Sequence, residues 1–486
     1  MTESRQIGTF SAAALVVANT IGAGVFTTSG FAIADLHTPE RVLFAWLCGG
    51  VLAVAGAISY GAMARQIPES GGEYTFLSQV VHPFAGFVAG WVSLLGGFTA
   101  PIAAAALTLQ AYVGGLIGPE LGGKWIGVGA IVLACLAHLR MQRGVHLQNV
   151  AVAIKLALLI AFAVGGGWLV YRQPSTGAES VAAVPPFEVT SFAMSLVWIS
   201  FAYSGWNAAV YVGGLVRNPR TALPRALLMG TACVGIVYVA INAVFLYAAP
   251  VDAIAGRPDI AVVAAVAIGG PALGAAVSLL VALALFTSIS SMVMAGPRVY
   301  ARMAEDGVFP GWLRVGDAVP VPAVLFQGVA ASVVVWSAEL VEVLGYVGFL
   351  LGLSAAATVG ALLHTRRRRG GAAVPIPGYP WIPAGFIAAT LAISALMAVH
   401  DPKGVAIALG SVAAGFPIYL WMVSRRPQRP AATMPGRTAA ALPIRMEVLH
   451  ERDEVLDCHR PCAARGDSGG RRRSGAQIAG PRNGAG

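Results

Sequence analysis

Hydrophobic runs of about 20 residues recur along most of this 486-residue chain. An α-helix needs a run of that length to cross the hydrocarbon core of a bilayer. The chain is 57% hydrophobic and 11% charged, a composition outside the range of ordinary soluble domains. A transmembrane β-barrel would show short segments of alternating polarity, and these runs do not alternate. The sequence therefore predicts an all-α integral membrane protein surrounded by the lipid bilayer.

Twelve spans are expected, and the first is too long and too uninterrupted to be a cleaved signal peptide. Their approximate bounds are 9–34, 41–64, 84–113, 124–139, 146–171, 189–215, 223–249, 268–302, 321–337, 340–364, 379–399 and 403–424. Residues 425–486 change to a composition rich in Arg, Gly, Pro and Ala. That change predicts a disordered tail after the last span.

Basic residues are concentrated in the loops on one side of the predicted membrane. That side holds Arg5, Arg65, Arg140, Arg143, Arg217, Arg220, Arg225, Arg298, Arg302, Arg314, Arg366–Arg369, Arg425, Arg426 and Arg429, and the other holds Arg41, Lys124, Arg172, Arg257 and Lys403. By the positive-inside rule, residues 1–8 and the tail 425–486 are cytoplasmic, in a multi-pass protein of the plasma (inner) membrane. This distribution accounts for the net charge of +10, so no nucleic-acid partner is expected.

Two hydrophobic runs are interrupted by segments that contain glycine. They are Ile21-Gly22-Ala23-Gly24 in the first run and Tyr203-Ser204-Gly205-Trp206-Asn207 in the sixth. Glycines in membrane helices also allow close helix packing, which is the simpler explanation for a single one. Two clustered breaks instead favour a transporter's binding site, because lipid cannot satisfy free backbone groups. The five-span offset predicts inverted repeats over residues 9–171 and 188–364, with residues 379–424 appended.

The chemistry of these breaks suits a zwitterion. The first run is expected to resume as a helix near Val25, which leaves the N–H groups of Ala23, Gly24 and Val25 available to a carboxylate. Carbonyl groups are expected to be free near Thr20, Ile21, Phe201, Ala202 and Ser204. Carbonyls at helix C-termini favour a cation. The two sets together fit the carboxylate and ammonium groups of an amino acid.

Several segments resemble signature sequences of the amino acid–polyamine–organocation superfamily. They are NTIGAGVF at 19–26, FAYSGWN at 201–207, PESGGEY at 68–74, and the segments 217–226 and 298–310. The segment FAYSGWN has the form seen in L-type amino acid transporters and their bacterial relatives. The resemblance implies amino acid transport and a leucine-transporter-like fold of twelve helices, a 5+5 inverted repeat with discontinuous helices 1 and 6. The family often has serine at the position of Ala23, with its hydroxyl group near the substrate carboxylate. Ala23 offers the backbone N–H to that carboxylate but has no hydroxyl group.

Lys155 lies about nine residues into the fifth span, or about 14 Å deep in a core about 30 Å thick. A charge at that depth is usually functional, although backbone carbonyls can also satisfy an ammonium in a structural role. In transporters that resemble this chain, the matching lysine occupies the place where relatives bind sodium, and it bridges helices 1 and 8. That resemblance implies Ser288 and Ser291, and also Ser290, as neighbours. No sodium requirement is expected, and protons are a candidate coupling ion.

Aromatic side chains near the second break are expected to line the site. Phe201 and Trp206 flank the break, and Tyr238 matches a binding-site tyrosine of the L-type relatives by its spacing from Phe201. Trp91 is a weaker candidate, since aromatic residues in spans also pack or anchor at interfaces. Because no carboxylate is placed to pair with a cationic side chain, neutral amino acids are favoured.

Together these observations predict a secondary active transporter that moves neutral L-amino acids by alternating access, by exchange or with protons. The alternatives are a membrane sensor that binds an amino acid without transport, and a transporter of cationic amino acids or polyamines. No cofactor, metal ion or enzymatic activity is expected. The predicted substrate-binding residues are Thr20, Ile21, Gly22, Ala23, Gly24, Phe201, Ala202, Ser204, Gly205, Trp206 and Tyr238, and the predicted coupling residues are Lys155, Ser288 and Ser291.

Overall fold

The computed structural model describes residues 7–118, 123–140, 144–172, 185–313 and 321–424. These residues are helical with short connections, and they contain no strand beyond one isolated bridge between Ile7 and Val216. The prediction of an all-α protein is therefore confirmed for the part described. The tail 425–486 and the basic loop residues Arg5, Arg143 and Arg314 lie outside the described residues.

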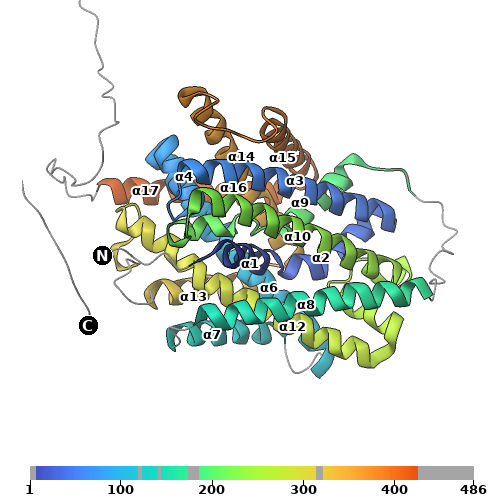
Figure 1. Cartoon of the computed structure of the whole chain (residues 1–486). Helices are drawn as coiled ribbons and strands as arrows, with labels where there is room; N and C mark the ends of the chain where they lie inside the picture. The colour runs from blue at the N-terminus through green and yellow to red at the C-terminus, as the bar shows by residue number, and fades with distance from the viewer. Residues whose placement is uncertain (1–6, 119–122, 141–143, 173–184, 314–320, 425–486) are drawn as a thin grey trace, which may run out of the picture. The chain divides into compact units, whose positions relative to one another are not determined.

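The helices follow one another along the chain with few long connections (Figure 1). The first half contains α1 (Thr9–Thr20), α2 (Ala23–Leu36), α3 (Pro39–Gln66), α4 (Gly72–Val80), α5 (Pro83–Val92), the π-helix η1 (Ser93–Thr99), α6 (Ala100–Ile117), α7 (Gly123–Arg140) and α8 (Gly144–Arg172). The second half contains α9 (Val189–Ala202), the 3-10 helix η4 (Ala208–Leu215), α10 (Pro219–Tyr247), α11 (Val251–Ile254), α12 (Ile260–Glu305), the 3-10 helix η5 (Gly311–Leu313), α13 (Val321–Ser337), α14 (Leu340–Arg369), α15 (Trp381–His400), α16 (Pro402–Ala413) and α17 (Gly415–Ser424).

Among the described residues, eight helical segments are long and apolar enough to cross a membrane. The count is nine if the bent pair α1 and α2 forms one span. Three shorter apolar helices, Gly123–Leu139, Val189–Ala202 and Val321–Ser337, lie where three further spans are expected. The eighth span is longer than predicted, because α12 begins at Ile260 and continues through a non-helical Gly270 to Glu305. A glycine can adopt the positive φ of 72° found there, so the chain bends without ending the helix.

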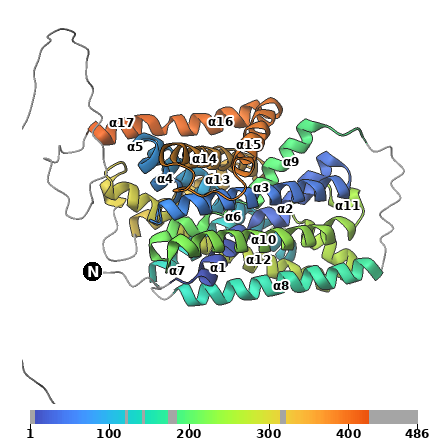
Figure 2. The same cartoon turned by 45° about the horizontal axis from the view of Figure 1, so that its top comes forward.

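The long helices pack so that some are enclosed and others face outward. In Figure 2, α8 runs along one edge of the bundle and α16 and α17 run along the opposite edge. The segment Pro83–Ile117 is instead largely buried among other helices. Apolar side chains such as Val51, Ile236 and Leu283 are exposed on the outer surface. An apolar outer surface is suited to lipid, which supports a multi-pass membrane protein.

The centre of the bundle is built around α1, α2 and α9. Helix α10 packs along both α1 and α3, and α9 packs against α2, α14 and α15. Helix α12 contacts α1 and α2 from another direction. The two broken runs are therefore enclosed by helices from distant parts of the sequence, which positions them away from lipid.

Candidate functional site

The first break separates α1 from α2 within the first hydrophobic run. Helix α1 ends at Thr20, Ile21 and Gly22 leave the helical conformation, and α2 begins at Ala23. The two helix axes differ by 42°. The helix therefore resumes two residues before the predicted Val25. Gly22 occupies the N-cap position and has no side chain to cap the first turn, so the N-terminal N–H groups of α2 have no side-chain acceptor from that residue.

The second break follows α9, which ends at Ala202. Residues 203–207 form turns, and Gly205 has a φ of 97°, a conformation that favours glycine. The chain then continues as the 3-10 helix η4, which is itself irregular at Val212, rather than as an α-helix. The structure has a break at the predicted position, and this second break is longer than the first.

The two breaks lie against each other. A β-carbon on Gly24 would lie 2.5 Å from the Cβ of Ala202. A β-carbon on Gly205 would lie 2.6 Å from the carbonyl oxygen of Asn19. Each break therefore has a glycine where the backbone of the other approaches, and a larger residue at either position would separate them.

Tyr238 of α10 connects the breaks through its hydroxyl group. The hydroxyl oxygen lies 2.6 Å from the carbonyl oxygen of Thr20 and 3.1 Å from that of Ala202. It has one proton, so it donates to one of these carbonyls at a time. The side chain is fully buried and also packs against Trp46 and Tyr203. Tyr238 thus holds the C-terminal ends of α1 and α9 together.

Lys155 of α8 joins the first break to α12. Its side chain is 6% exposed, and Nζ donates to the carbonyl oxygen of Ile21 at 2.5 Å, to Ser288 Oγ at 3.1 Å and to the carbonyl oxygen of Ala284 at 3.5 Å. Ser288 Oγ also donates to the Ile21 carbonyl, at 2.8 Å. Three acceptors match the three protons of an ammonium group. None of the ion pairs within the described part of the chain includes Lys155.

A cavity of about 790 Å³ lies against both breaks, and we call it the larger cavity. Of the predicted substrate-binding residues, it is lined by Thr20, Gly22, Ala23, Gly24, Phe201, Ala202, Ser204 and Gly205. It continues past Ser288 and Met292 to Arg298 and Arg302 near the end of α12. The cavity therefore leads from the backbone groups of the breaks toward a region with charged residues of both signs, since Glu69 and Glu305 also line it.

This arrangement can be compared with known proteins. The family profile described as "Amino acid permease" matches residues 7–423, which is most of the chain. The chain belongs to the amino acid permease family. The matched range includes both breaks, Lys155 and Tyr238, and the family consists of transporters rather than enzymes.

Relatives of the permease with curated descriptions are amino acid transporters. The serine/threonine exchanger SteT of Bacillus subtilis is 28% identical over 87% of this chain and 98% of its own length. The human large neutral amino acids transporter small subunit 2 is 25% identical over 85% of this chain and 80% of its own length. The human cystine/glutamate transporter is 25% identical over 93% of this chain and 92% of its own length. These similarities support amino acid transport by the permease.

Several carbonyl groups at the breaks of the permease were expected to be free, but they accept hydrogen bonds from other residues. The carbonyls of Thr20 and Ala202 face Tyr238, and that of Ile21 accepts from Lys155 and Ser288. The carbonyl of Phe201 accepts from the N–H of Ser204 at 2.8 Å. Sequence alone could not reveal these donors, because all but Ser204 come from distant helices. A carbonyl oxygen has two lone pairs, so each group can still accept a second hydrogen bond.

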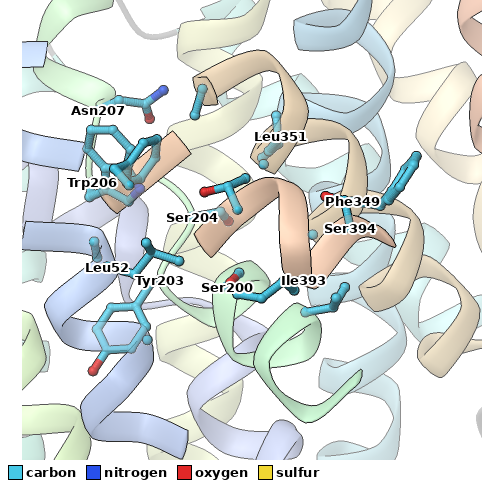
Figure 3. A pocket seen from close by; sticks show the side chains of 18 of the residues that line it. Leu52, Ser200, Tyr203, Ser204, Trp206, Asn207, Phe349, Leu351, Ile393 and Ser394 are labelled. Carbon is cyan, nitrogen blue, oxygen red and sulfur yellow. The ribbon is translucent and has the colours of Figure 1, made fainter. Parts of the chain in front are cut away.

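Two predicted aromatic residues point away from the larger cavity. Trp206 lines a second, smaller cavity of about 70 Å³ between α3, α9, α14 and α15 (Figure 3). Its ring packs against Tyr60 with centroids 4.7 Å apart and against Phe386 at 6.4 Å. Trp91 donates to the carbonyl of Ser411 in α16 and lines neither cavity.

The remaining predicted residues of α12 contact different partners. Ser291 Oγ donates to Asn19 Oδ1 at 3.3 Å, so it lies beside the end of α1. Ser290 instead lies 2.8 Å from His138 Nε2 of α7. Ser288 and Ser291 therefore share the side of α12 that faces the first break, whereas Ser290 does not.

A polar and aromatic cluster next to Tyr238 was not predicted from the sequence. Trp46 Nε1 donates to Ser29 Oγ at 2.7 Å, and Ser29 Oγ donates to Asn242 Oδ1 at 2.6 Å. The Tyr203 hydroxyl donates to the carbonyl of Trp46 at 3.2 Å. These buried contacts join α2, α3, α10 and the second break. Only the one-turn spacing of Tyr238 and Asn242 is visible in the sequence, because the other partners are distant.

A buried carboxylate was also missed. Glu73, in α4, is 4% exposed and its Oε1 accepts from the Asn207 side chain in the second break. Glu73 lies between the predicted spans 41–64 and 84–113, and no carboxylate was predicted to pair with a cationic substrate side chain. The sequence signal that could have indicated this burial is the position of Glu73 in the 68–74 segment. It directly follows two glycines, which let the chain turn inward with positive φ.

Proposed function

We propose that this permease is a secondary active transporter that moves neutral L-amino acids by alternating access, without sodium. The observation that carries the proposal is the direct contact of the two breaks at the end of the larger cavity. Backbone dipoles of four half-helical ends then meet at one place, where they can bind a zwitterion. Exchange and proton-linked uptake are both compatible with this arrangement.

The substrate's carboxylate would bind at the start of α2. Ala23 and Gly24 line the larger cavity at the positive end of the helix dipole. The ammonium group would bind the second lone pairs of the carbonyls of Thr20 and Ala202, whose first acceptor positions face Tyr238. Because Ala23 has no hydroxyl group, the carboxylate is held by backbone donors alone.

The substrate's side chain would lie against an apolar wall. Phe201, Pro101, Met292 and Ala295 line the larger cavity, whose charged lining residues are Glu69 in the loop before α4 and Arg298, Arg302 and Glu305 toward the end of α12. An apolar wall favours neutral side chains. Phe201 would close the site from the outer side in the occluded state.

The topology is part of the same proposal. Twelve spans arranged as two inverted repeats would place Arg298 and Arg302 on the cytoplasmic side of the plasma membrane, with both termini. The larger cavity reaches these two arginines, so the conformation described here would be inward-facing. Lys155 would occupy the place of a coupling ion as a fixed cation between α1, α8 and α12.

Proteoliposomes that contain the full-length protein provide the test. Uptake of a panel of radiolabelled amino acids should be measured with and without an internal amino acid, a pH gradient and sodium. We expect neutral L-amino acids to be taken up or exchanged, and sodium to have no effect. Substrate binding to purified protein without any flux would support the sensor instead, and selective flux of lysine, arginine or polyamines would overturn the proposed specificity.

A further inference from the structure

Glu73 is buried beside the second break and only half of its carboxyl group has partners. Oε1 accepts from the Tyr60 hydroxyl at 3.1 Å and from the Asn207 amide. Oε2 is buried and has no hydrogen-bond partner among the described residues. None of the ion pairs within that part of the chain includes Glu73.

These surroundings offer hydrogen-bond donors to only one of the two carboxyl oxygens. A buried carboxylate needs donors on both oxygens or a cation nearby, and leaving a charge unpaired costs several kcal/mol. The groups that face Glu73 are the neutral Tyr60 of α3, Asn207 and the Tyr211 hydroxyl of η4. Helix α5, which packs on α4, has no charged side chain between Pro83 and Val92, and α14 presents the Thr358 hydroxyl toward Tyr60. A proton on Oε2 removes the charge.

The smaller cavity places several hydroxyl groups around Glu73, outside the larger cavity. Glu73 lines this cavity together with Ser200, Ser204, Thr390 and Ser394, and the three serines are labelled in Figure 3. Thr390 Oγ1 is also buried without a partner. A cavity of about 70 Å³ has room for several water molecules, which these polar groups can bind and which can carry protons.

The same segment of the second break separates the two cavities. Ser204, Gly205 and Asn207 line both the smaller and the larger cavity. Asn207 also donates to Glu73 directly. A change at Glu73 is therefore transmitted to the wall of the substrate site through one side chain.

We propose that Glu73 is a proton-binding residue that couples the smaller cavity to the substrate site through Asn207, an inference that rests on the transport function proposed above. A proton from water in the smaller cavity binds Oε2 and neutralises the carboxyl group. When Glu73 ionises, it returns that proton to water, and both oxygens then need donors. Asn207 and the second break must reposition to supply them, which changes the wall of the larger cavity.

The test compares three proteins in proteoliposomes: the wild type, Glu73→Gln and the control Glu188→Gln. Glu188 is an exposed carboxylate that lines neither cavity, and its Oε2 accepts from Ser191 Oγ at 3.3 Å. Counterflow of a neutral amino acid should be measured at equal internal and external pH, from about pH 5 to about pH 8. We expect the wild type and Glu188→Gln to change in rate by about fivefold or more across this range, and Glu73→Gln to give a flat profile.

The outcomes separate this inference from the proposed function. Absence of wild-type counterflow with every amino acid would refute the transport function itself. Wild-type counterflow that does not vary with pH would refute the role of Glu73 without any variant. A pH profile of Glu73→Gln that matches the wild type would also overturn it. If Glu73→Gln does not fold, Glu73→Asp must shift the profile for the proposal to stand.

Discussion

Gly24 and Ala202 mark the closest approach of the two broken runs. A β-carbon on Gly24 would lie 2.5 Å from the Cβ of Ala202, and real β-carbons essentially never come within 3.0 Å of another heavy atom. The absence of a side chain on Gly24 therefore allows the start of α2 to touch the end of α9. This contact is what makes one site from two segments that are far apart in sequence.

The glycines at the breaks should differ sharply in their tolerance of alanine. Gly24→Ala would collide with Ala202, and Gly205→Ala would meet the Asn19 carbonyl oxygen while adopting a φ of 97°. We expect each change to lower the initial rate of uptake by about tenfold or more. Uptake should be measured in proteoliposomes and normalised to the amount of reconstituted protein.

Gly22→Ala is the matched control for these two variants. Gly22 has a φ of −131°, and a β-carbon there would approach nothing closer than the Thr20 carbonyl oxygen at 3.9 Å. We expect its transport rate to stay within about twofold of the wild type. Equal loss of transport in Gly22→Ala and Gly24→Ala would contradict the steric argument.

Removing the Tyr238 hydroxyl should weaken substrate binding without unfolding the protein. Tyr238→Phe retains the ring packing against Trp46 and Tyr203 but deprives the Thr20 and Ala202 carbonyls of their shared donor. The loss of one buried hydrogen bond, worth about 1 kcal/mol, corresponds to about a fivefold rise in KM. Tyr203→Phe is the control, because its hydroxyl donates to Trp46 and not to a break carbonyl. A larger rise in KM for Tyr203→Phe would show that the bridging carbonyls are not part of the site.

Lys155 should be essential for transport and should make sodium unnecessary. Lys155→Ala removes a buried cation that donates to Ile21 and Ser288, and leaves their oxygens without that donor. We expect uptake to fall by about a hundredfold or more, and wild-type uptake to be the same in sodium and choline buffers. Lys124→Ala is the control, because Lys124 forms a partly exposed ion pair with Glu339. Wild-type uptake by Lys155→Ala would refute this role.

The parts of the site that follow from backbone rules could be predicted from the sequence. Gly22, Gly24 and Gly205 mark both breaks to within about two residues, because helices cannot leave lipid-facing backbone unsatisfied and glycine permits the turns. The inward direction of Lys155 follows from the cost of a charge in lipid.

The parts that depend on tertiary packing could not be predicted. Whether Trp206 faces the substrate or α3 depends on the turn that follows α9, whose direction is set by distant helices. The burial of Glu73 depends on how α4 packs against α14 and η4. The long α12 depends on a Gly270 that bends the chain without ending the helix. Local sequence patterns do not contain these relationships.

Trp206 should therefore contribute to stability more than to substrate affinity. Its indole ring packs against Tyr60 and Phe386 and lies close over Gly56 of α3, outside the larger cavity. Trp206→Ala would leave a void between α3 and α15, and we expect the protein to lose about 3 kcal/mol of stability. Thermal unfolding in detergent should detect this loss, while the KM of the surviving protein stays within about twofold of the wild type. Phe201→Ala provides the contrast, since Phe201 lines the larger cavity and its removal should raise KM about tenfold with a smaller effect on unfolding. If Trp206→Ala raised KM as much as Phe201→Ala at unchanged thermal stability, the tryptophan would belong to the substrate site after all.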